Sequence, residues 1–107
     1  MWILRGEADD EPFVFRLRPG AIKTIGRAPR ADLILDAALV SRLHCRLEAG
    51  EAAMVVVDLE STNGTFVNDK RIERGTIENG DRLRVGRVEL TVERQSSMNG
   101  DADDQGA

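Results

Sequence analysis

The chain of 107 residues contains one cysteine, has an apolar content of 41% and carries a formal net charge of −4. This length suits one domain with its own hydrophobic core, and a lone cysteine can form neither an internal disulfide framework nor a zinc site by itself. The negative charge argues against general binding of nucleic acid, and no apolar run approaches the roughly 18 residues of a membrane span. We therefore expect a reduced, cytoplasmic protein, or the cytosolic part of a larger one, without a signal peptide.

Short β-strands separated by turn residues are predicted along most of the chain. The first two are joined by an acidic turn at 7–12, and the loop 27–31 contains Pro29, which blocks strand pairing. The strands are expected, in chain order, at residues 2–5, 13–18, 21–25, 32–35, 42–49, 52–59, 65–67, 70–72, 82–86 and 87–93. Such spacing is typical of an all-β protein, and it predicts an antiparallel β-sandwich of about eleven short strands.

The clearest alternation of apolar and polar residues runs over 42–49. Its odd-numbered positions are apolar and share one face, so Cys45 is predicted to be a core residue and not a reactive thiol, whereas His44 falls on the opposite face. Asn63 and Gly64 form the strongest hairpin signal, because both residues tolerate a positive φ in a type I′ turn. A second tight turn is expected at 68–69.

The apolar pattern stops after residue 94. Residues 95–107 are small and polar, and three of them are aspartates. We expect one domain at 1–94, followed by a disordered acidic tail or linker at 95–107.

Three loops carry side chains suited to binding an anion. The first lies in the segment 22–31, which holds Lys23, Arg27 and Arg30 and no acidic residue. The second begins at Ser41, and the third, 61–65, offers hydroxyls and a carboxamide beside the Asn-Gly pair. In a β-sandwich these loops could meet at one end of the fold.

Taken in order, these segments resemble the conserved loops of the forkhead-associated (FHA) domain, an FHA/SMAD-like β-sandwich that binds phosphothreonine peptides. The resemblance covers about residues 2–93. One departure is Asp69, at a position where the family often has glycine, but aspartate also tolerates a left-handed turn. The matching residues are 26–27, 32–35, 41–44, 58–65, 67–68, 80–81 and Gly86.

The resemblance implies that Arg27, Ser41, Arg42 and Thr62 bind the phosphothreonine. Arg27 would supply a charge-assisted hydrogen bond to the phosphate, and the two hydroxyls would donate further bonds. Arg42 would contribute either its backbone N–H or its guanidinium. Asn63 would bind the peptide backbone beside the phosphothreonine.

Four other matching residues, Gly26, His44, Gly64 and Asn68, are expected to be structural. A single histidine without acidic or cysteine partners gives little support to a catalytic or metal-binding role. The resemblance instead implies that His44 braces the loop that contains Ser41, and that Asn68 braces its own loop. Gly64 is required by the turn, and Gly26 ends a strand.

No catalytic motif is recognisable, so we expect a non-catalytic protein without cofactor or metal. The expected function is a phosphothreonine-dependent peptide-binding or protein-binding module in Ser/Thr kinase signalling. Its partner would be a phosphothreonine-containing protein, such as a Ser/Thr kinase or its substrate, bound by a monomer without nucleic acid or membrane. Leu39 and Val40 would favour an apolar residue three positions after the phosphothreonine. Two alternatives remain: a phospho-independent interaction domain with the same fold, and a sandwich that binds a small anion or carbohydrate.

Overall fold

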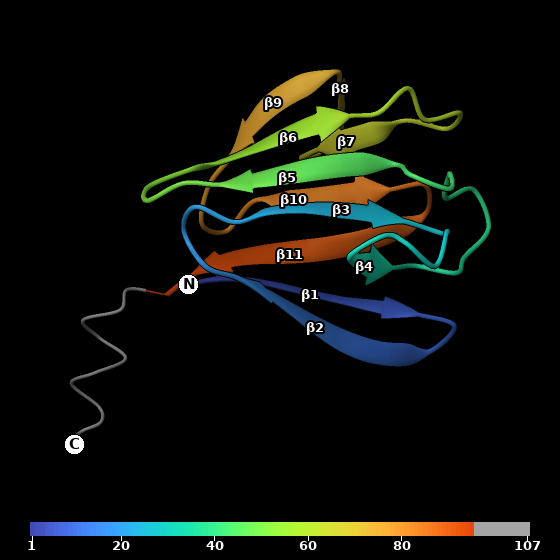
Figure 1. Cartoon of the computed structure of the whole chain (residues 1–107), viewed down its shortest axis with the longest axis horizontal. Helices are drawn as coiled ribbons and strands as arrows, with labels where there is room; N and C mark the ends of the chain where they lie inside the picture. The colour runs from blue at the N-terminus through green and yellow to red at the C-terminus, as the bar shows by residue number, and fades with distance from the viewer. Residues whose placement is uncertain (96–107) are drawn as a thin grey trace.

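A computed structural model describes residues 1–95 of the chain. Within this range eleven strands form two sheets packed face to face (Figure 1), which confirms the predicted all-β sandwich. No helix of residues 1–95 is long and apolar enough to cross a membrane. The expected tail at 95–107 lies outside the described residues, except for Gln95.

One sheet has six strands and the other has five. The order across the larger sheet is β2 (Glu11–Leu17), β1 (Trp2–Ala8), β11 (Val88–Arg94), β10 (Arg82–Val85), β7 (Thr65–Val67) and β8 (Lys70–Ile72). The order across the smaller sheet is β4 (Leu33–Ile34), β3 (Ile22–Gly26), β5 (Cys45–Ala49), β6 (Met54–Asp58) and β9 (Arg74–Ile77). Neighbouring strands are antiparallel except β3 and β4, which pair in parallel.

The strands differ from the predicted ones mainly at their ends. β1 and β2 are longer than expected, so the acidic turn contracts to Asp9 and Asp10, whose φ angles are 52° and 65°. Asp tolerates this left-handed conformation better than most residues with a side chain. β5 begins at Cys45 rather than at 42, and β9 was not predicted because Gly75 interrupts its apolar pattern.

The predicted hairpin at Asn63 and Gly64 is wrong, because β6 and β7 belong to different sheets. The connection crosses from one layer to the other, and of these two residues only Gly64 has a positive φ, of 95°. A two-residue turn with both φ angles positive occurs instead at Asn68 and Asp69, with φ of 50° and 71°. It joins the paired strands β7 and β8, as predicted for that turn.

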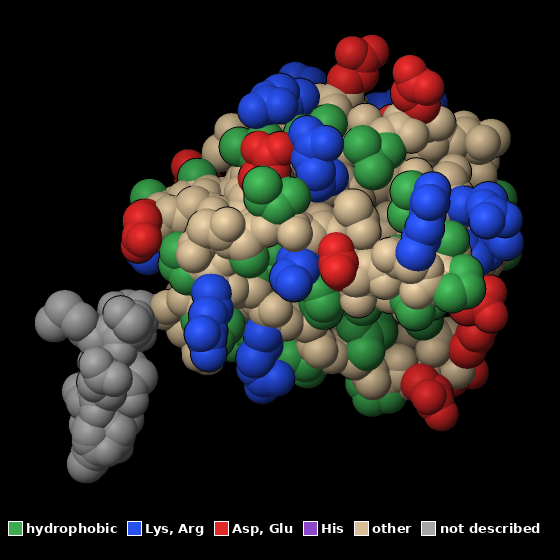
Figure 2. Space-filling model, viewed as in Figure 1, with side chains coloured by type: hydrophobic (Ala, Val, Ile, Leu, Met, Phe, Trp, Pro, Cys, Tyr) green, Lys and Arg blue, Asp and Glu red, His purple; other side chains and the backbone are tan. Residues whose placement is uncertain are grey.

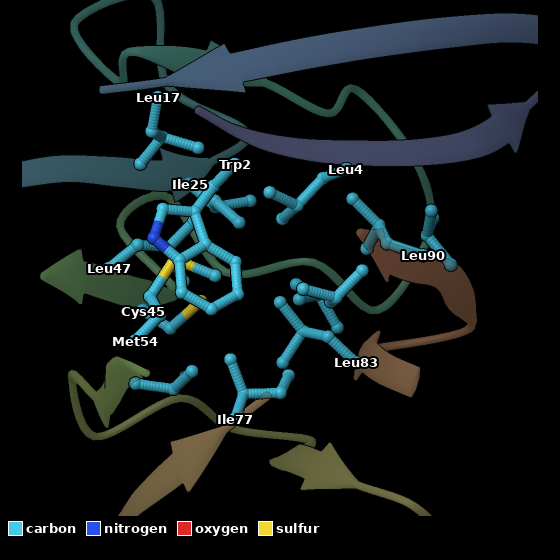
Figure 3. Packing of buried hydrophobic residues seen from close by; sticks show 14 of the residues in the cluster. Trp2, Leu4, Leu17, Ile25, Cys45, Leu47, Met54, Ile77, Leu83 and Leu90 are labelled. Atoms are coloured by element: carbon cyan, nitrogen blue, oxygen red, sulfur yellow. The ribbon is translucent and has the colours of Figure 1, made fainter. Parts of the chain in front are cut away.

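The hydrophobic core fills the space between the two sheets. The side chain of Trp2 is fully buried and lies beside Cys45, Leu47 and Met54 (Figure 3). Its indole nitrogen donates a hydrogen bond to the carbonyl oxygen of Gly50, at 2.8 Å. Burial raises the pKa of the Cys45 thiol to about 12 and keeps it protonated, as expected for a core residue.

The two ends of the described chain lie side by side. The N–H of Gln95 donates to the carbonyl of Met1, at 2.8 Å, and the amino group of Met1 donates to the carbonyl of Gln95, at 3.1 Å. The loops that follow β3, β4 and β6 lie at the opposite end of the sandwich (Figure 1). The three candidate anion-binding loops are therefore far from both ends of the described chain.

Candidate functional site

The structure brings together the five residues that were predicted to bind the phosphothreonine or the peptide backbone beside it. They line one open hollow of about 790 Å³, formed by the loop after β3, the segment 36–43 and the segment 60–63. Lys and Arg side chains are exposed at this end of the molecule in the space-filling view (Figure 2). The five are Arg27, Ser41, Arg42, Thr62 and Asn63.

The close approach of two backbone segments at Gly26 fixes one side of the hollow. A Cβ atom at Gly26 would lie 2.1 Å from the carbonyl oxygen of Arg42, so only glycine fits where β3 ends. Just beyond it, the N–H of Arg27 donates to the carbonyl of Ser41 and the N–H of Ala28 donates to that of Arg42, both at 3.0 Å. These bonds join the loop after β3 to the loop that contains Ser41.

The Arg27 side chain is anchored at one atom and free at its tip. Its Nε donates to the carbonyl oxygen of Val40, at 3.0 Å. Within residues 1–95, neither terminal nitrogen of this guanidinium makes a hydrogen bond or an ion pair. The side chain of Val40 is buried in the core, so it offers no surface to a ligand, whereas Leu39 is 41% exposed. Of the two residues predicted to read an apolar side chain, only Leu39 can do so.

The hydroxyl of Ser41 is oriented by the neighbouring loop. Its oxygen accepts a hydrogen bond from the N–H of Thr62, at 3.1 Å, which leaves the hydroxyl hydrogen available for donation. The backbone N–H and the guanidinium of Arg42 have no hydrogen-bond partner among the described residues. Both donors that the sequence left open for Arg42 are therefore available.

His44 lies beneath the hollow and is fully buried. Its Nδ1 accepts from the N–H of Ser41, at 3.0 Å, so its Nε2 carries the proton and donates to the carbonyl of Gly64, at 2.8 Å. Burial lowers the pKa of His44, against the opposing effects of the Gly64 carbonyl and the Asp58 carboxylate, which favours the neutral ring. The alternating pattern placed His44 on a polar face, but the segment that contains Gly64 covers that face.

Asp58, at the end of β6, organises the other wall of the hollow. One carboxylate oxygen accepts from the hydroxyls of Ser61, at 2.5 Å, and Thr65, at 2.6 Å, and the other accepts from the N–H of Ser61, at 3.1 Å. Desolvation would raise the pKa of Asp58, but these hydrogen bonds outweigh it and lower the pKa below its usual value. The Ser61 oxygen in turn accepts from the N–H of Gly64, at 3.0 Å. The sequence analysis assigned no role to Asp58. The available signal was the hydroxyl side chains of Ser61 and Thr65, three and seven residues later, which can donate hydrogen bonds to a carboxylate.

Of the two asparagines in the matching segments, Asn63 lies at the hollow and Asn68 lies outside it. Asn63 lines the hollow and donates from its amide nitrogen to the carbonyl of Leu39, at 3.2 Å, while its side-chain oxygen accepts no hydrogen bond from the described residues. Asn68 is not part of the hollow. Its side chain donates to Asp81, at 3.1 Å, and accepts from the N–H of Arg82, at 2.9 Å, which ties the β7–β8 turn to β10.

The free groups of the hollow can bind an anion but are not arranged for nucleophilic catalysis. Guanidinium, hydroxyl and N–H groups are all donors, and charge-assisted donors suit a phosphate or carboxylate. His44 cannot activate the hydroxyl of Ser41 as a base, because its Nδ1 is bonded to the backbone N–H of that residue. Among residues 1–95, no group of His, Cys, Asp and Glu could hold a metal ion.

Two acidic residues that sequence reasoning missed also line the hollow. Asp36 follows β4, and Glu60 follows β6; both are exposed. Neither forms an ion pair within the described part of the chain. No motif marks Asp36, and Glu60 lies within the matching segment 58–65 but received no role there, because the position of both carboxylates depends on how the two loops converge.

Comparisons of the sequence and of the fold with known proteins identify the same family, the FHA domain. The family model of the FHA domain matches residues 23–86, which is more than half of the chain. The glycogen accumulation regulator GarA of Mycobacterium tuberculosis is 37% identical over 70 residues, a match that covers 65% of this chain and 43% of GarA. The chain thus spans less than half the length of this curated relative.

Solved structures with the same fold include domains in complex with partners. The FHA domain of FhaA, solved with the intracellular domain of Rv3910, is 31% identical with a TM-score of 0.78, and the match covers 87% of this chain and 100% of that one. EmbR of Mycobacterium tuberculosis, solved with a low-affinity phosphopeptide, is 29% identical with a TM-score of 0.72. That match covers 85% of this chain and 24% of EmbR.

Proposed function

Because the chain belongs to the FHA domain family, we propose that it is a phosphothreonine-dependent peptide-binding module that acts in Ser/Thr kinase signalling. The observation that carries this proposal is the convergence of Arg27, Ser41 and Thr62 on one hollow, with donors that the described protein does not use itself. The function is binding and not catalysis. The partner is a phosphothreonine-containing protein, such as a Ser/Thr kinase or one of its substrates.

Each donor has a separate task in holding the phosphate. The terminal nitrogens of Arg27 suit a bidentate bond to two phosphate oxygens, since Nε is already held by the carbonyl of Val40. Ser41 donates its hydroxyl hydrogen, because its oxygen is occupied by the N–H of Thr62. Thr62 and Arg42 supply further donors from either side of the hollow.

The peptide backbone is held beside the phosphate by Asn63. Its side-chain oxygen is available to accept from a peptide N–H, while its amide nitrogen stays on the carbonyl of Leu39. The exposed side chain of Leu39 offers an apolar contact to a ligand residue near the phosphothreonine. Recognition of a phosphorylated residue by arginine is a common mode of peptide binding.

The test is a comparison of phosphorylated and unphosphorylated forms of peptides selected from an array, measured by calorimetric titration. We expect only the phosphothreonine form to bind. Loss of one charge-assisted bond in Arg27→Ala or Ser41→Ala costs about 1.5–3 kcal/mol, or roughly tenfold to more than a hundredfold in affinity. Arg30→Ala is the matched control, since Arg30 is an exposed arginine of the same loop that does not line the hollow.

Wild-type affinity in both Arg27→Ala and Ser41→Ala would refute the proposal. Equal binding of the unphosphorylated peptide would instead support a phospho-independent interaction domain. Because Ser41 also accepts the N–H of Thr62, each variant is first checked for an unchanged unfolding transition.

A further inference from the structure

Two residues of the hollow have a backbone conformation that their side chains disfavour. Six non-glycine residues between 1 and 95 have a positive φ, and four of them are Asn or Asp in two-residue turns. The other two are Leu39, with φ of 72°, and Glu60, with φ of 57°. Both line the hollow. Unfavourable backbone conformations of this kind concentrate at sites that bind ligands.

The charge of Glu60 is also unfavourable for the binding of an anion. It brings a negative charge to a hollow whose arginines and hydroxyls are arranged for an anion, and like charges repel. Its carboxylate is exposed and forms no ion pair with any described residue. Neither the local conformation nor a contact within residues 1–95 therefore explains a glutamate at this position.

A cation supplied by the ligand would explain it. We propose that Glu60 is a specificity-determining residue that selects phosphothreonine peptides with a lysine or arginine close to the phosphothreonine. Glu60 stands at the rim shared by this hollow and a neighbouring one that is lined by Ser61, Arg71 and Glu73. A peptide held at the phosphate by Arg27 passes this rim, and a basic side chain there pairs with the carboxylate. Asp36, a second acidic residue that lines the hollow, adds to the same preference.

This proposal rests on the proposed function, and one experiment separates the two. A phosphothreonine peptide is synthesised with lysine, alanine or glutamate in turn at each of the four positions on either side of the phosphothreonine. We expect wild-type protein to bind the lysine peptide roughly three- to tenfold more tightly than the glutamate peptide at one or more positions, the range for an exposed ion pair that is exchanged for a repulsion.

The decisive variant is Glu60→Gln, which keeps the size of the side chain and removes its charge. Because the same change also removes the repulsion between Glu60 and the phosphate, the readout is a ratio of affinities. The preference for the lysine peptide over the glutamate peptide should shrink in Glu60→Gln, and a structural defect, which weakens both peptides alike, would not change this ratio. Glu60→Gly should abolish the preference in the same way and raise the midpoint of thermal unfolding, because glycine adopts a positive φ without a steric penalty.

Glu73→Gln is the matched control, because Glu73 is exposed and lines only the neighbouring hollow. It should keep the wild-type preference. A preference that falls equally in Glu73→Gln and Glu60→Gln would reflect the net charge of −4 and would overturn the role of Glu60. Phosphothreonine binding with no preference at any position would also overturn it while leaving the proposed function intact. Failure of every phosphorylated peptide to bind would overturn both.

Discussion

Gly26→Ala should damage both the fold and the hollow, because the added methyl group has no room. It would lie 2.1 Å from the carbonyl oxygen of Arg42, 2.8 Å from its carbonyl carbon and 2.9 Å from the Cα of Leu43. All three are backbone atoms, so no side-chain rotation relieves the overlap. The end of β3 must move away from the segment that contains Ser41.

The cost can be worked out from what this movement breaks. Overpacking of a tight site costs about 1–3 kcal/mol. The displacement also strains the hydrogen bonds from Arg27 to Ser41 and from Ala28 to Arg42, each worth about 0.5–1.5 kcal/mol. The free energy of unfolding should therefore fall by about 2–6 kcal/mol, a large share of the roughly 5–15 kcal/mol typical of a domain. Phosphopeptide affinity should fall as well, since Arg42 is displaced from the hollow.

Urea unfolding followed by tryptophan fluorescence measures this change, because Trp2 is the sole tryptophan and is fully buried. Gly75→Ala in β9 is the matched control: its nearest contact would be an ordinary 3.4 Å to a side-chain atom of Ile72, and its φ is not positive. The control should change stability by less than about 1 kcal/mol. A fall in the free energy of unfolding of less than about 1 kcal/mol in Gly26→Ala, or of no more than in Gly75→Ala, would refute the predicted overlap.

Two further predictions concern the bonds beneath the hollow. The pKa of His44 is lower in the folded state than the roughly 6.5 of the unfolded chain, so the unfolded state binds more protons and stability falls as the pH drops below about 6.5 toward the folded pKa. Urea unfolding at several pH values should show this slope in wild-type protein and a flatter one in His44→Gln; equal slopes would contradict the assignment. Ser61→Ala removes a hydrogen bond to Asp58 and leaves the buried N–H of Gly64 without an acceptor, so it should cost about 2–4 kcal/mol in the same assay, and a loss below about 1 kcal/mol would argue against the network.

Local patterns predicted the parts of the fold that depend on local geometry. The alternation over β5 gave the buried face that contains Cys45, and the turn at Asn68 and Asp69 was predicted because both residues tolerate a positive φ. The same local preference of the Asn-Gly pair at 63–64 led to the wrong prediction of a hairpin. Its preference for a turn is local, but the direction of the chain after Gly64 is set by the bonds of Asp58 to Ser61 and Thr65.

The resemblance predicted which residues come together in one hollow, but not the contacts that the loops impose on them. Nothing in an alternating pattern shows that a loop 20 residues away covers His44 and accepts a hydrogen bond from its Nε2. The positive φ of Glu60 has no sequence signal either, because residues that favour this conformation are usually Gly, Asn or Asp. The parallel pairing of β4 with β3 escaped prediction because two residues are too few to reveal a direction.

The hydrogen bonds between Met1 and Gln95 have a practical consequence for protein engineering. A unit whose entry and exit points touch can be spliced into a surface turn of a host protein with very short linkers, because the host backbone scarcely has to open. The hollow would then point outward from the host, since the loops that line it lie at the far end of the sandwich. Residues 1–95 thus have the geometry of an insertable domain, and with the proposed function such an insertion into a fluorescent protein or an enzyme would report phosphorylation.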